Sequence, residues 1–354
     1  MTAITYIGIE LSARTQFALL GMEIFTLTLF AVVALVKVAT MDIAGEMTPS
    51  LDWFNPIHLS SHALAAGMIF AIFIYWGWDS TVTVNEESAD ATEAPGRAAV
   101  WSTVILVAIY VLLAIATTAY HGPDFLANDD TGDIFGVLGS DVLGSPLDKL
   151  LIIAVLTSAS ASTQTTILPT TRTVLSMAAK GAAPRYWAVI HDRYLTPKWA
   201  TIWMGIISIV WYVGLKILSE NILYDAIAAL GLAIAFYYAL TGFAAPIYYR
   251  RELGKSTRNL LMIGVAPTVG SLVLTWAFFK SAIDFWDPAN SESGTSWLGV
   301  GPPFFLGIGM LVIGIPVMLL QRRRSPEFFR RRPEVADPEV LSPAVPAAPV
   351  GSGD

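Results

Sequence analysis

Long runs of apolar residues dominate the chain, and short polar stretches interrupt them. A helix needs roughly 20 mainly apolar residues to cross a bilayer. The pattern therefore predicts an all-α integral membrane protein with about eight transmembrane helices. The expected spans are residues 17–38, 62–84, 98–120, 148–170, 200–217, 222–249, 260–281 and 299–320.

The second of these spans turns polar before it has crossed the membrane. Its apolar run, "ALAAGMIFAIFI", is followed by "YWGWDS", in which Gly77 removes a side chain and Asp79 introduces a charge. Backbone that is not helical is tolerated at membrane depth only where it is buried in protein or lines a cavity. The pattern favours a discontinuous helix whose freed N–H and C=O groups bind a polar or zwitterionic ligand. The alternative is a helix that ends early, with a loop from Asp79 onward.

The first span contains a carboxylate, Glu23, with apolar residues on both sides. Ionisable residues at such a depth are costly and are functional candidates by default. Because burial favours the protonated carboxyl group, Glu23 is a candidate for taking up and releasing a proton. A glutamate that pairs with a fixed Arg or Lys, or that reaches the inner interface, is the structural alternative.

The fourth span is rich in hydroxyl groups, in the sequence "LTSASASTQTT". Close helix packing and bonds to the carbonyl four residues earlier explain part of this composition. The density exceeds what packing requires, so we expect one face to contribute to an ion or substrate pathway.

Composition agrees with a membrane protein and excludes several functional classes. Hydrophobic residues make up 55% and charged residues 14% of the chain, whereas soluble proteins are about 25% charged. Cysteine is absent, which excludes disulfides and thiolate metal sites. His58 and His62 have the spacing of a metal pair but lack a third ligand nearby, so we expect no metal and no cofactor. Motifs for phosphate, dinucleotide or nucleic-acid binding and for nucleophilic catalysis are missing, so the sequence predicts neither an enzyme nor a nucleic-acid partner.

Basic residues predict the orientation. If the N-terminus is cytoplasmic, all but four of the 21 lysines and arginines lie on the inner side. The four exceptions lie at helix ends, where the side chain reaches the interface: Lys37, Lys149, Lys216 and Lys280. We therefore expect a multi-pass protein of the cytoplasmic membrane with both termini inside. Residues 1–321 would form the transmembrane domain, and residues 322–354, rich in Pro and Ala, a disordered cytoplasmic tail.

Three stretches resemble a known family, the amino acid–polyamine–organocation (APC) superfamily, particularly its bacterial amino acid permeases. "GWDSTVTVNEESADATEAPGRAAV" resembles the signature of the family's sixth helix. "TTRTVLSMAAKGAAPRYWAVIHDRYLTP" is similar to the inner end of the eighth helix and the loop after it. "YIGIELSARTQFALLGME" resembles the lead into the fifth helix. The three occur in family order over most of residues 4–250.

The resemblance implies a LeuT-like fold, with two inverted repeats of five helices within twelve. The eight spans would then be helices five to twelve, so the first repeat contributes only its last helix. Substrate in this fold lies between two broken helices, one from each repeat. The chain is therefore expected to supply half of the site, with the rest in a longer polypeptide or a companion chain. A polypeptide that truly begins at Met1 is not expected to transport by itself.

The resemblance also implies roles for individual residues. Backbone carbonyls of the unwound segment would receive a substrate ammonium group; its residues are Tyr75, Trp76, Gly77, Trp78 and Asp79. Phe73 matches an aromatic position that closes over substrate in relatives. Glu23 falls where many sodium-independent relatives place a lysine, and the reversed charge makes proton coupling or a bound cation plausible. Thr157 and Ser158 resemble a hydroxyl pair that ligates sodium in more distant members of the fold.

The sequence thus predicts a secondary active transporter of amino acids or related amines in a lipid bilayer. It would work by alternating access, with proton coupling favoured over sodium coupling. One alternative is a permease for polyamines or other organic cations on the same fold. Another is a non-transporting sensor or partner subunit descended from a permease.

Overall fold

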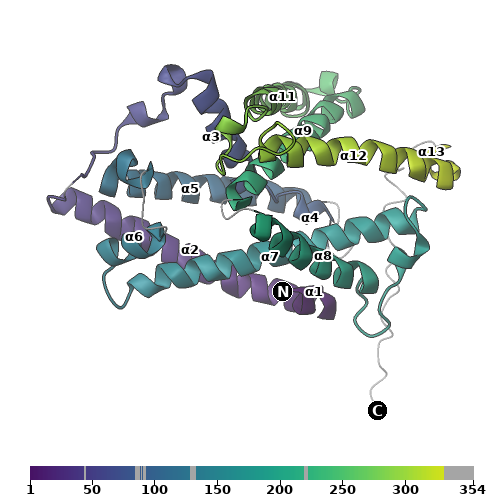
Figure 1. The fold of residues 1–354 in the computed structure, drawn as a ribbon, viewed down its shortest axis with the longest axis horizontal. Helices are drawn as coiled ribbons and strands as arrows, with labels where there is room; N and C mark the ends of the chain where they lie inside the picture. Colours follow the sequence, from purple (N-terminus) through teal and green to yellow (C-terminus); the bar gives the residue numbers. More distant parts are fainter. Residues whose placement is uncertain are drawn as a thin grey trace, which may run out of the picture.

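The computed structural model is built from helices (Figure 1). It describes residues 1–43, 45–83, 88, 90, 93–127, 133–218 and 222–330. Within these ranges, seven helices are long and apolar enough to cross a membrane. They are built on α2 (Ile9–Thr40), α5 (Ala94–Ala127), α7 (Asp148–Ala179), α8 (Lys198–Leu218), α9 (Ile222–Tyr248), α11 (Ala266–Asp284) and α12 (Pro302–Arg324).

Shorter helices connect or flank the long ones. They are α1 (Thr2–Ile7), α3 (Ser61–Ile74), α4 (Ser80–Thr83), α6 (Ile134–Val142), α10 (Thr257–Asn259) and α13 (Pro326–Arg330). A π-helical turn, Leu260–Val265, joins α10 to α11. Short 3-10 turns occur at Leu51–Phe54, Pro56–His58, Arg185–Ala188, Leu253–Lys255 and Pro288–Asn290.

The all-α prediction is confirmed, with differences in three places. The second span is shorter than predicted, because α3 has 14 residues and covers about 21 Å of the roughly 30 Å hydrocarbon core. Helix α6 lies in a stretch that the sequence analysis left as a loop; its nine residues are too few for a span. Residues 322–330 are mainly helical, as the end of α12 and as α13, and the rest of the predicted tail lies outside the described residues.

Helices α2, α5, α6 and α7 pack together and are called the α2 group below. All four contribute to one buried core, which contains Phe30, Ala31, Ala34, Ala116, Tyr120, Leu138, Val142 and Leu151. Small alanine side chains let the helices approach closely. The buried Tyr120 hydroxyl donates to the Asp141 carbonyl at 2.9 Å, so this phenol joins α5 to α6 without an unpaired polar group.

Helices α3, α9, α11 and α12 form a second set, called the α9 group, with α9 in contact with the other three. Its core contains Ile69, Ala228, Leu232, Ala282 and Phe285. A Cβ atom on Gly231 of α9 would lie 2.6 Å from the carbonyl oxygen of Ile69 on α3. The close approach of these two helices therefore requires glycine at this position.

The two groups meet at the second predicted span. Helix α3 packs against α9 and α11, whereas α4 packs against α5 and α7. In Figure 1, α11 is seen end-on while α2, α5 and α7 run across the view, so α11 crosses them steeply. Residues 75–79, between α3 and α4, therefore connect the α9 group to the α2 group.

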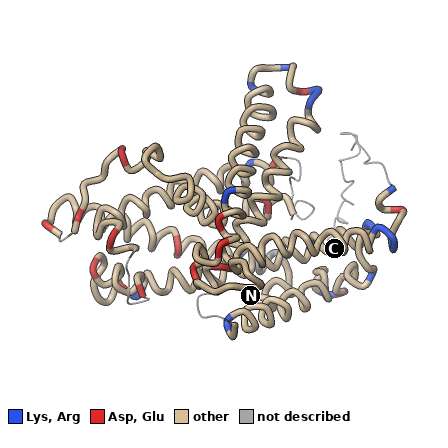
Figure 2. Tube along the Cα trace, turned by 45° about the horizontal axis from the view of Figure 1, so that its top comes forward, with Lys and Arg blue, Asp and Glu red and all other residues tan. Residues whose placement is uncertain are grey.

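Charged residues are unevenly distributed along the molecule (Figure 2). Acidic residues dominate the end that carries α6, at the left of the view. Lysines and arginines gather at the turn between α9 and α11 and at the far end of α12. The predicted orientation rests on this separation.

Candidate functional site

The candidate site is the interruption between Ile74 and Ser80. Gly77 has a φ of 125°, a backbone conformation that glycine adopts without strain and other residues rarely adopt. The Trp76 amide donates to the Phe73 carbonyl at 3.1 Å, and the Ser80 amide donates to the Gly77 carbonyl at 3.0 Å. Two tight turns thus replace the regular helical hydrogen bonds at this point.

Four backbone groups of the interruption lack partners among the described residues. They are the carbonyls of Tyr75 and Trp76 and the amides of Trp78 and Asp79. All four residues are half-buried. Polar backbone groups held away from bulk water favour binding a ligand that satisfies them.

Asp79 is held by two consecutive tyrosines of α9. The Tyr237 hydroxyl donates to Oδ2 at 3.0 Å, and the Tyr238 hydroxyl donates to Oδ1 at 3.2 Å. Each carboxylate oxygen thus has one phenol donor, and hydrogen bonds to an ionised group are stronger than those between neutral groups. The side chain of Asp79 therefore anchors the interruption to α9.

Aromatic contacts extend this anchor. The Trp76 indole Nε1 donates to the Tyr237 hydroxyl at 2.6 Å. The Trp78 ring lies 5.2 Å from the Tyr238 ring, between centroids. Both tryptophans of "YWGWDS" therefore contact α9, through one hydrogen bond and one ring contact.

On the opposite side, α5 contacts the interruption through Tyr110. Its hydroxyl donates to the carbonyl of Ile74 at 3.2 Å. Its ring meets that of Tyr75 edge-on, with centroids 5.3 Å apart. The Thr81 hydroxyl of α4 also lies 3.1 Å from the Pro95 carbonyl at the start of α5.

Glu23 lies on α2, half-buried, and close enough to Tyr110 for its carboxylate to act electrostatically on that hydroxyl. Among the described residues, no Lys or Arg forms an ion pair with Glu23. Glu23 and the interruption thus both lie near Tyr110.

The hydroxyl pair of α7 is not brought to Glu23 by any described contact. The Thr157 hydroxyl lies 3.0 Å from the Ile153 carbonyl and 2.9 Å from the Ala154 carbonyl of its own helix. Ser158 is half-buried beside it. The contact between α2 and α7 involves a different polar residue of α7, Gln164.

Gln164 is buried, and its Oε1 accepts a hydrogen bond from Gln16 Nε2 at 3.1 Å. The same Gln16 amide donates to the Ala161 carbonyl at 2.9 Å. The buried Nε2 of Gln164 has no partner among the described residues. A polar, incompletely satisfied contact therefore lies between α2 and α7.

The sequence analysis missed the residues that hold the interruption: Tyr110, Tyr237 and Tyr238. The signal for two of them was the pair of adjacent tyrosines within the apolar run of α9. Of the predicted substrate residues, Phe73 is half-buried near the end of α3, one turn before Gly77.

The described residues contain no group of three or more His, Cys, Asp or Glu side chains that could hold a metal ion. His62 Nδ1 lies 3.0 Å from Asp284 Oδ2, and Lys280 contacts the same carboxylate. This histidine therefore takes part in a hydrogen-bonded contact between α3 and α11.

Comparison with known proteins points in the same direction as this geometry. A sequence model described as amino acid permease matches residues 1–313. Uncharacterised transporters of Mycobacterium tuberculosis and Mycobacterium bovis are each 26% identical to the chain over 304 residues, covering 85% of the chain and 62% of the relative. An amino-acid permease of Candida albicans is 21% identical over 314 residues, covering 83% of the chain and 50% of that protein. The chain thus spans between half and about three fifths of the length of these curated relatives.

The matched region includes all of the interruption and both groups of helices except the last part of α12. The relatives are named as transporters and a permease. These names agree with the prediction that the chain is a transporter and not an enzyme. The chain belongs to the amino acid permease family.

Proposed function

We propose that the protein transports amino acids across the cytoplasmic membrane by alternating access, and that this chain carries half of the substrate site. The observation that supports the proposal is the interruption at residues 75–79. It combines unpaired backbone groups at membrane depth with a position between two groups of helices. A ligand bound there can act on both groups at once.

The unpaired carbonyls of Tyr75 and Trp76 are the proposed acceptors for a substrate ammonium group. Phe73 is proposed to cover the bound substrate. Because Asp79 already accepts a hydrogen bond at each oxygen, we assign it to holding the interruption in shape. The substrate's carboxylate group would be bound by the other half of the site, outside this chain.

Proton coupling is proposed to run through Glu23. The carboxylate lies in the first span, without a described cationic partner, and acts on Tyr110, whose hydroxyl bonds the last carbonyl of α3. A change in its charge would therefore be felt at the interruption. Thr157 and Ser158 are retained as a candidate cation site only for the sodium-coupled alternative.

We propose the orientation with both termini in the cytoplasm. It places the basic turn between α9 and α11 and the arginine-rich end of α12 on the inner side, as the positive-inside rule requires.

The proposal is tested by measuring the uptake of labelled amino acids into vesicles that contain the protein, expressed from its own gene. A pH gradient is imposed across the vesicle membrane. An inward proton gradient should drive uptake in the unmodified protein, and Glu23→Gln should abolish that dependence. Glu327→Gln, an exposed carboxylate beyond the spans, is the matched control and should transport normally. Uptake by Glu23→Gln that still follows the gradient would refute the coupling role.

Competition distinguishes the alternative substrates. Excess unlabelled amino acids should reduce uptake more than polyamines or quaternary amines do. The opposite order would favour the organic-cation permease. An absence of uptake, together with thermal stability that no amino acid changes, would favour a non-transporting partner subunit.

A further inference from the structure

A second feature lies away from the interruption, where α7 and α8 meet the turn Arg185–Ala188. These elements line an open cavity of about 260 Å³. Its lining includes Val174, Met177, Trp187, Trp203, Met204 and Ile207.

Three of the polar side chains that reach the cavity have hydrogen-bond partners within the protein. The hydroxyls of Thr170 and Thr171 donate to carbonyls of their own helix, at 2.7 Å and 2.8 Å. The Trp203 indole Nε1 donates to the Tyr186 hydroxyl at 3.3 Å. The cavity therefore presents methyl groups and aromatic faces, and its natural occupant is apolar.

The cavity is long enough to hold part of a lipid acyl chain. Its α8 lining runs from Ala200 to Ile207, which is about 10 Å along a helix. Half of the hydrocarbon core is about 15 Å thick, so a chain lying along α8 would occupy the cavity over roughly two thirds of that thickness.

Residues next to the cavity lining in the sequence are aromatic and basic, and they are called the rim below. Lys198 Nζ lies 4.9 Å from the centre of the Trp199 ring, which stacks on Tyr186 at 5.4 Å. The Lys198 amide donates to the Val189 carbonyl at 3.0 Å, so the start of α8 lies against the segment that follows the turn. Tryptophan and tyrosine favour the headgroup level of a membrane.

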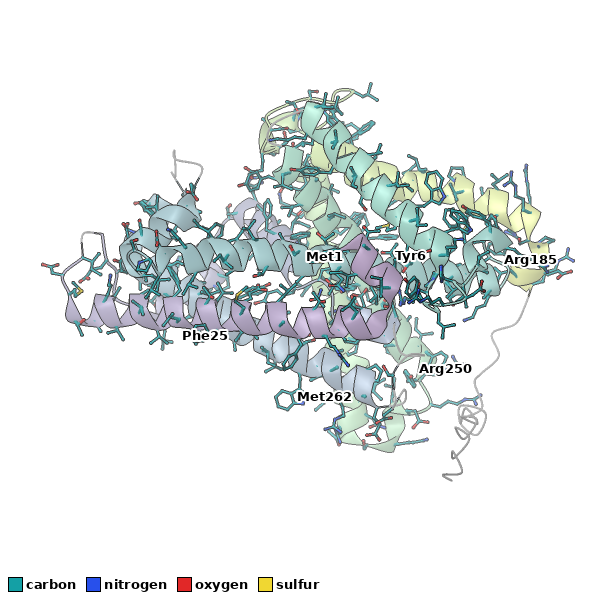
Figure 3. All side chains as sticks on the ribbon, turned by 90° about the horizontal axis from the view of Figure 1, so that it is seen from below. Met1, Tyr6, Phe25, Arg185, Arg250 and Met262 are labelled. Carbon is teal, nitrogen blue, oxygen red and sulfur yellow. The ribbon has the colours of Figure 1, made fainter. Side chains whose placement is uncertain are left out.

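Positive charge outweighs negative charge at this rim. Residues 180–199 contain Lys180, Arg185, Arg193 and Lys198, against a single carboxylate, Asp192. Arg185 is exposed at the end of the α7–α8 pair (Figure 3). Basic residues beside an intramembrane pocket are the usual partners of phosphate headgroups.

From these contacts we infer that the cavity binds one anionic phospholipid, with an acyl chain between α7 and α8 and its phosphate at Arg185 and Lys198. An acyl chain gains little from entering this cavity by apolar burial alone, because the surrounding lipid tails are as apolar as the cavity walls. The charged rim therefore supplies the selectivity for an anionic headgroup.

Native mass spectrometry of the purified chain in non-ionic detergent tests this site, with phosphatidylglycerol and phosphatidylcholine as the lipids. The chain should retain one more molecule of phosphatidylglycerol than of phosphatidylcholine. The double variant Arg185→Gln/Lys198→Gln should weaken that binding by roughly 30-fold, the factor expected from two surface charges. Arg250→Gln/Arg251→Gln removes the same charge at the α9–α11 turn, which is well separated from Arg185 in Figure 3, and should leave binding unchanged.

Two further measurements separate the headgroup from the acyl chain. Ala183→Leu, which fills the cavity and keeps the charges, should also lose the lipid. The thermal midpoint of the unmodified chain should rise with phosphatidylglycerol and stay constant with glycerol 3-phosphate. An equal rise with glycerol 3-phosphate, equal retention of phosphatidylcholine, or equal loss in both double variants would overturn the inference.

Discussion

The α9 group and the α2 group hold the interrupted helix in different ways. On the α9 side, Tyr237 and Tyr238 each donate a hydrogen bond to Asp79. On the α2-group side, the Tyr110 hydroxyl contacts the Ile74 carbonyl at 3.2 Å, and the Thr81 hydroxyl lies 3.1 Å from the Pro95 carbonyl of α5. The first anchor places one donor on each oxygen of a carboxylate, and the second consists of two separate contacts between hydroxyl groups and backbone carbonyls.

Packing shows the same difference. Helix α3 is pressed against α9 at Gly231, where no side chain fits, while α4 has four residues and contacts α5 and α7. The interruption is therefore held more tightly by the α9 group than by the α2 group. Conformational change is therefore expected first where the interruption meets the α2 group, because fewer interactions must break there.

The largest expected effect comes from filling the contact between α3 and α9. Gly231→Val should lower the stability of the chain by about 3 kcal/mol or more, the upper part of the range for overpacked cores. Its Cβ alone would lie 2.6 Å from the Ile69 carbonyl oxygen. Thermal unfolding in detergent measures the loss.

Gly214→Val on α8 is the matched control, because a Cβ there has no neighbour within 4 Å. A similar loss in both variants would show that the backbone preference of glycine, and not the contact with α3, sets the effect.

A smaller loss of stability, about 1–3 kcal/mol, is expected from Tyr237→Phe. The variant removes a donor to Asp79 and leaves the Trp76 indole without its acceptor. Tyr212→Phe on the exposed face of α8 serves as the control and should change the thermal midpoint little. If Tyr237→Phe is equally harmless, the anchor on α9 contributes nothing to stability.

The smallest effect is expected from Tyr110→Phe, about 0.6 kcal/mol, the average for a hydrogen bond between membrane helices. The same thermal assay applies, with Tyr237→Phe measured alongside it. A loss as large as that of Tyr237→Phe would show that both groups hold the interruption equally, and the comparison drawn above would fail.

Much of the fold could be predicted from hydropathy, because each long helix contains a mainly apolar stretch long enough to cross a membrane. The interruption was also visible, since Gly77 and Asp79 break an apolar run that is too short to cross the membrane. Helix α6 was not visible, because nine residues fall below the length at which a span can be recognised. Helix α2 also begins earlier than its predicted span, because hydropathy reports membrane depth and polar residues near Gln16 still form a helix.

The partners of the interruption could not be predicted. Tyr237 lies 158 residues from Asp79 along the chain, and a tyrosine within an apolar run equally fits a membrane interface or a packed core. Hydropathy assigns residues to helices but does not say which faces meet. The proposed link from Glu23 through Tyr110 to the carbonyl of Ile74 involves three helices that are separate in the sequence, so it could be proposed only from coordinates.

The two tyrosines of α9 have a mechanical consequence. Consecutive residues on a helix point about 100° apart, yet Tyr237 and Tyr238 reach opposite oxygens of one carboxylate. Asp79 is thus held from two directions, which opposes rotation of α9 relative to Asp79 as well as their separation. A rotation of α9 about its own axis would therefore also rotate Asp79 and α4, which follows it. The resulting change in angle between α3 and α4 would be absorbed at Gly77, whose backbone is the least restricted in the segment.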